Sequence, residues 1–560
     1  MNFQLTKEQE HVKNIVREFA EKKIAPIAAQ LDANNTFPVD IVKEMGKMGI
    51  MGQPFPKESG GAGGDVISYA IAVEELSRVD GGVGVILSAH VSLGSWPIFA
   101  FGNEAQKEKY LKPLAKGEKL GAFGLTEPNA GSDAGKTETT AVLQGDHYIL
   151  NGNKIFITNA DHAETYVVFA VTKPGIGVRG ISAFIVEKGW PGFTYGMHYD
   201  KMGIRSSATA ELVFKDVKVP KENLLGEEGE GFKIAMQTLD GGRIGIAAQA
   251  LGIAQGAFEK ALEYAKERDQ FGAPIARQQA IGFKLADMAT KVRAARLMIY
   301  SAAFMKEQHM PYGTESAMAK MYASDICLEV VNDAVQIFGG YGYIKGFDVE
   351  RMYRDAKITT IYEGTNEIQR VVISAALLGK AKKSEDKAAT ATQKQANNRK
   401  KILLKDGSAK DRVDAFVKYL KEEGILNKDD KGEIKEISET DRLVCVGMGL
   451  YEKEDLQMIG KLAAVLQAPV GCSRPVAEER RWLPMGHFVG ISGQKFAGKF
   501  YLGVGISGAI QHIAGIRESK IITAINIDAN SPIFENVDYG IVGDMYEIIP
   551  LLTTALKESR

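Results

Sequence analysis

Residues 381–401 (AKKSEDKAATATQKQANNRKK) interrupt the hydrophobic patterning of this chain more sharply than any other segment. They hold seven basic and two acidic residues and almost no large apolar side chain. A segment of this composition cannot bury enough apolar surface to form a core. We interpret it as a flexible linker, so the chain is expected to fold as two separate parts. A nucleic-acid-binding tail is the alternative, and the lack of aromatic residues among the charges disfavours it.

The part before this segment changes pattern twice. Thr6 followed by Gln9 forms a capping box, after which apolar residues recur at helical spacing. From about residue 121, short segments such as KIFITN and ISAFIVE are rich in β-branched and aromatic residues, which indicates strands. Helical patterning then returns. This order predicts a helical domain over 1–121, a β domain over 122–231 and a second helical domain over 232–380.

The part after the segment alternates strands with helices. We expect a linker with one amphipathic helix over 381–437, the helix lying near residues 411–423. Strands are then expected at RLVCVG, APVGCS, HFVGIS, KFYLGV, KIITAIN and YGIVGD, with helices between them. Such alternation predicts a doubly wound parallel sheet over 438–560.

One glycine motif in this last part suggests a dinucleotide. GVGISG at 503–508 fits G-x-G-x-x-G, follows an expected strand and precedes an expected helix, and Asp528 ends the next strand. Glycines let a pyrophosphate approach the backbone, and the N–H groups of a helix N-terminus favour the anion. A glycine-rich turn between packed elements is the alternative.

Two segments of the first part could carry chemistry. The loop LTEPNAGSD at 125–133 offers hydroxyls and backbone N–H groups to a ring edge or a phosphate, although it could be an ordinary turn. Glu363 stands beside Gly364 at an expected turn. A carboxylate near an apolar pocket can have a raised pKa and act as a general base, and a solvated loop glutamate is the alternative.

Composition excludes several classes of protein. The formal net charge is −1, which gives no overall field for nucleic acid or an anionic membrane. The cysteines at 327, 445 and 472 are too few and too far apart for a disulfide framework or a thiolate metal site, so no metal is expected. The polar N-terminus does not resemble a signal peptide, and no membrane span is expected. We therefore expect a cytoplasmic protein.

Several motifs resemble those of acyl-CoA dehydrogenases in order and spacing. They are LTEPNAGSD, KIFITN, KMGIRSSATAELVFKDVKVP, LDGGRIGIAAQALGIAQGA, ERDQFGAPI, QIFGGYGY and IYEGTNEIQR. The resemblance covers residues 1 to about 380 and favours the short-chain, butyryl-CoA type. It implies an α, β-barrel, α fold, FAD, a CoA thioester substrate and a homotetramer.

The resemblance also assigns the catalytic residues. Glu363 resembles the base that removes the α-proton of the thioester while the β-hydride passes to the flavin. In some members the base lies instead just before the arginine of LDGGR, where this chain has Gly242. The thioester oxygen would be stabilised as an enolate by a flavin ribityl hydroxyl and the Glu363 N–H. The implied substrate contacts are Ser132, Asp240, Arg243, Tyr362 and Gly364.

The flavin contacts implied for the first part fall into three groups. One group lies near the ring and the pyrophosphate, a second near an adenine and pyrophosphate site shared between subunits, and a third just after the base. In this order they are Phe123, Leu125, Thr126, Ser132, Phe156 and Thr158; then Arg268, Phe271, Gln279, Gln336 and Gly340; then Thr365 and Glu367.

The last part resembles the FAD domain of the electron transfer flavoprotein α subunit, through APVGCSRPV, VGISGQ, LGVGISGAIQHIAG, AINID and SPIFENVDYGIVGD. The resemblance implies a second FAD, with Arg474 against the isoalloxazine. Met448 and Ile491 depart from the family, which usually has Arg and Gln there. The implied contacts are Ser473, Arg474, Ser492, Gly493, Ser507, Gln511, His512, Asn526 and Asp538.

These resemblances together imply a two-flavin enzyme that interconverts a short-chain acyl-CoA and its 2,3-enoyl-CoA. Electrons would pass to or from the fused flavin, and an external electron carrier is a possible partner. An electron-relay or scaffold protein without dehydrogenase turnover is the alternative. An acyl-CoA oxidase that discharges to oxygen is a third hypothesis.

Overall fold

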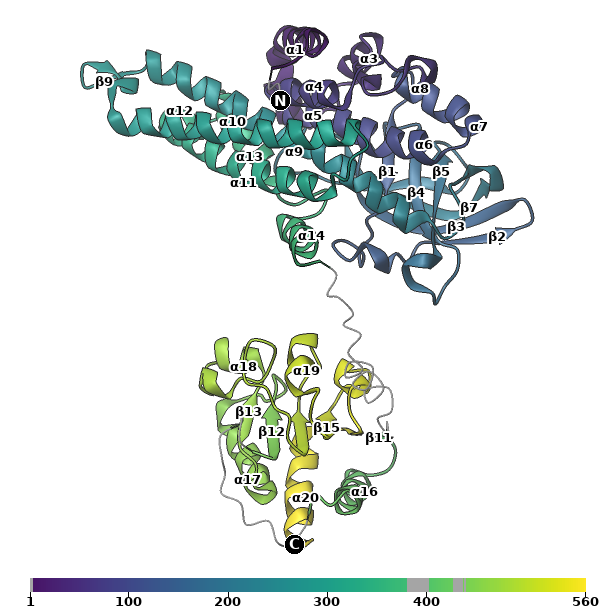
Figure 1. The fold of residues 1–560 in the computed structure, drawn as a ribbon, viewed down its shortest axis with the longest axis vertical. Coiled ribbons are helices and arrows are strands. Elements are labelled where there is room, and N and C mark those ends of the chain that lie inside the picture. Colours follow the sequence, from purple (N-terminus) through teal and green to yellow (C-terminus); the bar gives the residue numbers. More distant parts are fainter. Residues whose placement is uncertain (1–3, 380–401, 427–436, 438–439, 560) are drawn as a thin grey trace. The chain divides into compact units, whose positions relative to one another are not determined.

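The computed structural model describes residues 4–379, 402–426, 437 and 440–559. It divides into two compact units, residues 1–381 and 382–560 (Figure 1). The predicted flexible linker at 381–401 lies outside the described residues. The first unit is helical, then β, then helical, and the second is built on a parallel sheet, as the sequence patterning predicts.

Short capped helices form the first part of unit 1. The predicted capping box is present, because Thr6 Oγ1 accepts from Gln9 N at 3.2 Å and Gln9 Oε1 accepts from Thr6 N at 3.0 Å. Asp65 and Asp80 cap two later helices, each with a carboxylate that accepts from backbone N–H groups of the first turn. The helices are α1 (Lys7–Phe19), α2 (Ala25–Asn34), α3 (Val39–Lys47), α4 (Val66–Ser77), α5 (Gly81–Ser88), α6 (Trp96–Phe101), α7 (Glu104–Gln106) and α8 (Lys112–Ala115), with a π-helical segment, η4 (Ala89–Ser95), between α5 and α6.

One stretch in this region, Gly81–Phe101, is long and apolar enough to cross a membrane, with a mean hydropathy of 1.5. The sequence predicted no membrane span, whereas this stretch has the length and composition of one. Within the protein 78% of it is buried, so its apolar side chains are accounted for by packing in the core.

An eight-stranded sheet follows. β3 and β7 alternate buried residues with more exposed ones, because one face packs on a core and the other is more open, whereas β1, β4 and β5 are buried on both faces. The order is β6-β7-β3-β2-β4-β5-β8, with β1 parallel to β4. The strands are β1 (Gly121–Gly124), β2 (Thr140–Gln144), β3 (His147–Thr158), β4 (Thr165–Val171), β5 (Ile181–Glu187), β6 (Phe193–His198), β7 (Thr209–Pro220) and β8 (Leu224–Leu225).

Long helices complete unit 1, and α9 is their centre. Its many Gly and Ala residues are buried, which lets α4, α5, α10 and α11 approach closely (Figure 1). A short hairpin of β9 and β10 joins α9 to α10. The elements are α9 (Gly231–Glu267), β9 (Asp269–Gln270), β10 (Ala273–Pro274), α10 (Gln279–Glu307), α11 (Gly313–Phe338), α12 (Gly340–Tyr343), α13 (Asp348–Ile358) and α14 (Asn366–Leu378).

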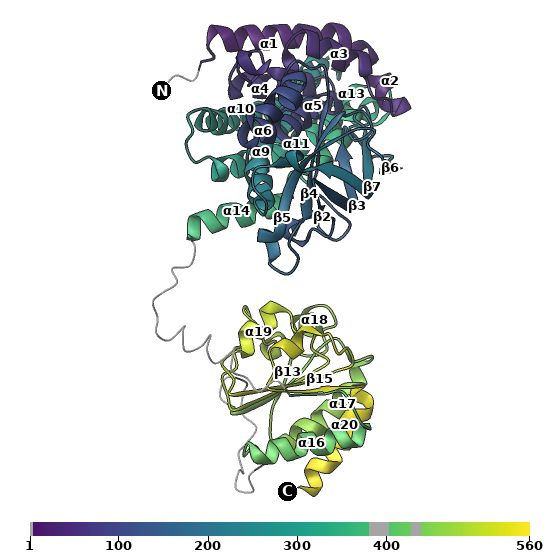
Figure 2. The same ribbon diagram turned by 90° about the vertical axis from the view of Figure 1, so that its right-hand side faces the viewer.

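Unit 2 is a doubly wound α/β domain. Six parallel strands run in the order β11-β16-β15-β14-β12-β13. Figure 2 shows α16, α17 and α20 on one face of this sheet and α18 and α19 on the other. The elements are β11 (Ile402–Leu404), α16 (Ala409–Glu422), β12 (Arg442–Val446), α17 (Leu456–Leu466), β13 (Val470–Cys472), α18 (Arg474–Glu478), β14 (Phe500–Val504), α19 (Ile510–Ile516), β15 (Ile521–Asn526), β16 (Tyr539–Val542) and α20 (Met545–Glu558).

Two expectations for this unit differ from the structure. Residues 402–426 were expected to belong to a linker, yet β11 pairs with β16 and α16 packs against α20. The buried apolar face of α16 requires that packing. HFVGIS was expected to be a strand, but it forms only isolated bridges, Cys472–Phe488 and Val489–Gln494.

Candidate active site

A tight turn between α13 and α14 presents Glu363. Glu363 and Gly364 have φ values of 55° and 86°, in the left-handed region, so the turn needs external support. Lys320 Nζ on α11 donates to Gly364 O at 2.9 Å, and Gln369 Nε2 donates to Gly364 O at 2.8 Å and to Glu363 O at 3.1 Å. Thr365 caps α14 through Ile368 N. The carboxylate therefore projects from a backbone that three hydrogen bonds and a helix cap hold in place.

Helix α9 leaves room for that carboxylate at Gly242. A Cβ at this position would lie 2.7 Å from Glu363 Oε1, 2.8 Å from its Cδ and closer still to Oε2. The next residue, Arg243, donates from Nη1 to Asp240 Oδ1 at 2.6 Å. The predicted base and the two predicted substrate residues of α9 are thus brought together.

Two buried polar atoms at this site could form hydrogen bonds to a bound molecule. Glu363 Oε2 and Arg243 Nε are buried, and neither has a hydrogen-bond partner among the described residues. Burial raises the pKa of Glu363 to about 8, and the charges of Arg243 and Lys320 partly oppose that rise. Burial lowers the pKa of Lys320 to about 7, with Glu363 opposing. A carboxylic acid with a pKa near neutrality suits general acid–base chemistry.

A cleft of about 380 Å³ contains this carboxylate. Its walls come from the sheet, from η4, from α9 and from the turn at Glu363. Many of the residues predicted from the sequence line it: Phe123, Leu125, Thr126, Ser132, Phe156, Thr158, Arg243, Tyr362, Glu363 and Gly364.

The cleft fits the flavin that the resemblance implies. Phe156 sits at a φ of 59° on β3 and is 59% exposed, an unusual position for a large apolar ring. Thr126, Ser132 and Thr158 supply hydroxyl groups on the same walls. An exposed aromatic face with hydroxyls beside it matches a flat, polar-edged ring, so these residues would hold an isoalloxazine.

A buried ion pair supports the loop at 125–133. Lys154, which is fully buried on β3, lies 2.5 Å from Glu127 Oε1 and donates to Leu125 O at 3.2 Å. Glu127 also accepts from Glu138 N at 2.6 Å. Burial lowers the pKa of Lys154 to about 8, with Glu127 opposing. Removing either partner would leave a charge in the core, so this pair fixes the loop.

The predicted adenine-site residues lie away from this cleft. They occupy the opposite end of the α9–α11 bundle, where β9 marks its tip (Figure 1). Phe271 is 97% exposed, and Arg268 lies over the ring of Tyr341. Glu367 is exposed in the first turn of α14. The residues of this distant group are Arg268, Phe271, Gln279, Gln336 and Gly340.

The predicted flavin residues of unit 2 gather mainly where parallel strands end. Ser473 follows β13, Ser507 and Gln511 follow β14, and Asn526 ends β15, where its side chain donates to Ile506 O at 2.9 Å. Ligands of open parallel sheets bind at this edge. Gly505 and Gly508 of the glycine motif have φ values of 61° and 88°.

Two polar side-chain atoms in this region are buried without a hydrogen-bond partner among the described residues. They are Ser473 Oγ and His512 Nδ1. Burial lowers the pKa of His512 to about 4, and its Nε2 lies 2.7 Å from the Tyr501 hydroxyl. Arg474 is exposed and pairs with Glu478 at 2.8 Å. Gly493 and Ser492 form the turn after Phe488, where a Cβ at 493 would strike the Phe488 ring.

The structure does not place Asp538 with the other predicted flavin residues of unit 2. Its carboxylate accepts from Ile522 N at 2.8 Å at the start of β15, so it stands at the amino edge of the sheet. Asp544 follows the carboxyl end of β16 and caps α20. Gly543 N beside it donates to Asn526 O at 3.0 Å. Asp544, not Asp538, therefore shares the edge with the other predicted residues.

Known sequence families match both units. Models of the acyl-CoA dehydrogenase N-terminal, middle and C-terminal domains match residues 6–118, 122–217 and 229–378, which together are more than half of the chain. The chain belongs to the acyl-CoA dehydrogenase family. The electron transfer flavoprotein FAD-binding domain matches residues 436–517 of this acyl-CoA dehydrogenase. Both resemblances drawn from the motifs are confirmed.

Individual relatives resemble unit 1. The short-chain specific acyl-CoA dehydrogenase of Clostridium acetobutylicum is 59% identical over 374 residues, 67% of this chain and 99% of that protein. Acryloyl-CoA reductase (NADH) of Anaerotignum propionicum is 51% identical, over 67% of this chain and 95% of its own length. The structure of butyryl-CoA dehydrogenase from Megasphaera elsdenii superposes with a TM-score of 0.67 at 55% identity, over 68% of this chain and all of that one.

Sequence reasoning missed the residues that support the site. Lys320 lies outside every quoted motif, and Lys154 and Gln249 lie inside two of them, but the sequence assigned no role to any of the three. Lys320 and Lys154 hold the turn and the loop of this acyl-CoA dehydrogenase. Gln249 accepts from the Tyr362 hydroxyl and donates to Gly81 O at 2.7 Å. A lysine among the small and apolar residues of a helix, as at Lys320, was the available signal.

Proposed function

We propose that this acyl-CoA dehydrogenase interconverts a short-chain acyl-CoA and its 2,3-enoyl-CoA, with Glu363 as the base. The observation that carries the proposal is the buried, unpartnered Oε2 of Glu363 in a cleft with flavin-type walls. In the dehydrogenation direction, Glu363 takes the α-proton and the α,β double bond forms as the β-hydride leaves. FAD, when bound, accepts that hydride.

The neighbouring residues would assist each step. The charges of Arg243 and Lys320 favour the ionised form of Glu363, which keeps the base usable despite its burial. The Glu363 N–H would stabilise the thioester oxygen as negative charge develops. In the reverse direction the protonated Glu363 returns the proton to the α-carbon. Arg243 and Asp240 would fix the thioester portion.

The proposed acyl group is short. The Clostridium acetobutylicum relative is named short-chain specific, and the Megasphaera elsdenii structure is named butyryl-CoA dehydrogenase. Acryloyl-CoA reductase is a further relative at 51% identity, so the reductive direction also has support. Butyryl-CoA and crotonyl-CoA are therefore the proposed substrate pair.

The fused domain would hold a second FAD and exchange electrons with the first. Its family match, the glycine turns at 505 and 508 and the unpartnered Ser473 and His512 atoms support this part of the proposal. Asp544 joins the proposed contacts in place of Asp538. Arg474 would lie against the ring, and its cation would favour an anionic reduced flavin.

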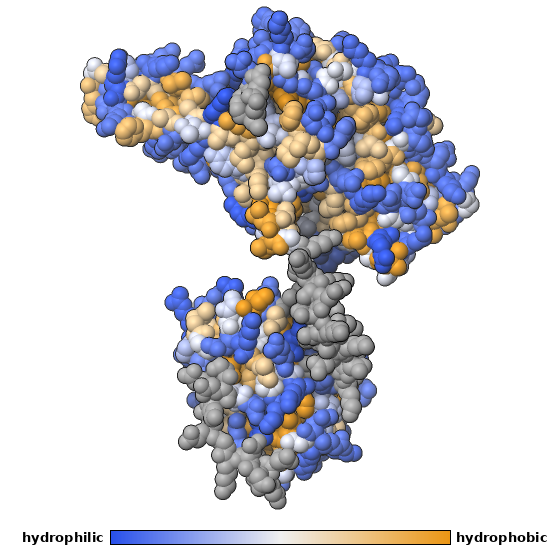
Figure 3. Space-filling model, viewed as in Figure 1, coloured by the Kyte–Doolittle hydropathy of each residue, from blue (hydrophilic) through white to orange (hydrophobic). Residues whose placement is uncertain are grey.

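The proposed assembly is a homotetramer in the cytoplasm. Apolar side chains of α14 stay exposed, Val371 at 59%, Leu377 at 72% and Leu378 at 84%, and Figure 3 shows this helix largely in orange. Phe271 at the tip of the β9–β10 hairpin is 97% exposed. Exposed apolar clusters of this kind mark protein interfaces.

Anaerobic titration tests the proposed function. Butyryl-CoA should bleach the flavin absorbance of the FAD-loaded protein, and crotonyl-CoA should restore it after chemical reduction. A protein that binds both thioesters without any absorbance change would be the electron-relay or scaffold alternative. Rapid turnover with oxygen as the acceptor would instead support the oxidase hypothesis.

A further inference from the structure

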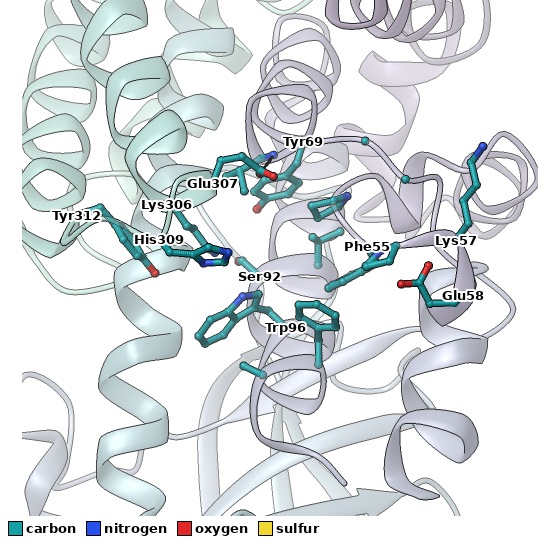
Figure 4. Close-up of a pocket in the computed structure, with 18 of the residues that line it drawn as sticks. Phe55, Lys57, Glu58, Tyr69, Ser92, Trp96, Lys306, Glu307, His309 and Tyr312 are labelled. Atoms are coloured by element: carbon teal, nitrogen blue, oxygen red, sulfur yellow. Dashed lines mark hydrogen bonds between the residues drawn. The ribbon is translucent and has the colours of Figure 1, made fainter. Parts of the chain in front are cut away.

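A second cavity, larger than the catalytic cleft, lies between α4, α6 and the end of α10. It has a volume of about 920 Å³, within the range of small-molecule sites. Figure 4 shows Tyr69, Trp96, Lys306 and Tyr312 around it. Among the described residues, none that lines this cavity also lines the cleft at Glu363. Its aromatic walls are Phe55, Tyr69, Trp96, Phe99 and Tyr312.

Lys306 gives this apolar cavity one cation. Its ammonium lies 4.8 Å from the centre of the Trp96 ring and 5.9 Å from that of Tyr312. Among the described residues, the contacts recorded for this ammonium are the two rings and the backbone of Gly241 on α9, against which it packs. Burial lowers its pKa to about 8, and the charges of Glu307 and Asp240 partly oppose this. An ammonium against two aromatic faces still has its hydrogen-bonding capacity unused.

The cavity opens to solvent and not to Glu363. Its rim carries the exposed residues Lys57, Glu58 and His309, so a dissolved ligand can enter. On the inner side the Tyr69 hydroxyl reaches Ser88 Oγ at 3.3 Å and packs against Gly245 of α9. Tyr69 is 3% exposed and stands between this cavity and the catalytic side of α9.

We propose that this cavity is a second binding site, which takes an apolar monocarboxylate with Lys306 as its counter-ion. The ammonium of Lys306, which lies among the aromatic rings, matches one carboxylate, whereas Lys57 lies on the exposed rim. The exposed carboxylates of Glu58 and Glu307 disfavour anions of higher charge. The aromatic walls favour a ring or a branched chain over a polar body. The site does not depend on the reaction assigned to Glu363.

Calorimetric titration of the FAD-loaded, full-length protein tests the site. The probe is 4-phenylbutyrate, and its neutral match is 4-phenylbutyramide, which has the same shape without the charge. We expect one carboxylate per chain, bound roughly tenfold or more tightly than the amide, because a charge-assisted hydrogen bond is lost with the amide. Lys306→Met should remove this difference, and Lys306→Arg should retain most of it.

Two controls locate the site. Lys57→Met removes the other cation of the cavity, and it should leave the affinity for the carboxylate unchanged. Saturating crotonyl-CoA should not displace the probe, because the cleft at Glu363 is separate. Equal affinity for acid and amide on the unmodified protein would overturn the proposal, even if Lys306→Met did not fold. Displacement by crotonyl-CoA, or no detectable binding of the acid, would overturn it as well.

Discussion

Replacing Gly242 with alanine should displace the carboxylate of Glu363, the proposed base, without altering the Glu363 side chain itself. The new Cβ would start 2.7 Å from Glu363 Oε1, whereas ordinary van der Waals contact begins near 3.4 Å. The carboxylate must therefore retreat by about 0.7 Å, and more at Oε2. A misplacement on the order of 1 Å costs about 10²-fold in rate. We expect kcat for butyryl-CoA to fall about hundredfold, equivalent to about 2.7 kcal/mol in activation free energy.

The assay is dye-coupled turnover of butyryl-CoA, with FAD content and thermal unfolding measured on the same samples. Gly460→Ala in α17 is the matched control, since no atom lies within 4 Å of its added Cβ. The control variant should be stabilised by about 1 kcal/mol, because alanine has a higher helix propensity than glycine, and its kcat should not change.

A double-mutant cycle separates displacement from general damage. Glu363→Asp withdraws the carboxylate by one methylene and lowers the rate by itself, but it frees space beside residue 242. In that background Gly242→Ala should cost less than about threefold, so the two changes are strongly non-additive. Full hundredfold losses in both backgrounds, or an unchanged kcat in the single Gly242 variant, would refute the reasoning.

Further predictions concern pH, stoichiometry and the fused domain. The rate of dehydrogenation should rise with pH and level off above about 8, because only ionised Glu363 accepts the proton. Burial raises the pKa of Glu363 from 4.5 to about 8 in the folded protein, so the free energy of unfolding of the parent falls as pH rises from about 5 to 8. Glutamine does not ionise. The stability of Glu363→Gln relative to the parent should therefore increase over this pH range in urea titrations. Extraction should yield two FAD molecules per full-length chain and one from a chain that ends at residue 379. A yield of one FAD from the full-length chain would contradict the second flavin site. Arg474→Ala should lower the potential of one flavin wave only, and a shift in both waves would count against the assignment. Reduction of the second flavin should keep its rate over about hundredfold dilution, since a tether replaces diffusion; a rate proportional to concentration would show transfer between chains.

The parts of the fold and site that sequence predicted are those with a local physical signal. The Thr6–Gln9 capping box, the β-branched and aromatic segments of β3 and β5 and the glycine turns at 505 and 508 each involve neighbouring residues. Glu363 was identified through its motif, and its raised pKa agrees with the environment that a base requires.

What sequence could not predict depends on contacts between distant segments. Lys320 and Lys154 look like ordinary helix and strand lysines until their carbonyl and carboxylate partners are placed. Asp538 and Asp544 stand six residues apart at either end of β16, and only the strand direction separates them. The second cavity draws its walls from three distant stretches of the chain, residues 54–69, 91–100 and 306–312, so no motif could reveal it.

The three residues of β11 have a consequence for fragments of this protein. They pair with the outer side of β16, and α16 after them brings Val413, Phe416 and Leu420 into the core with Leu552 and Leu556. A C-terminal fragment that begins near residue 435 would leave β16 as a bare edge beside an uncovered apolar helix. Unpaired edges of that kind recruit other chains and aggregate. A stable, separately expressed flavin domain should therefore begin before residue 402.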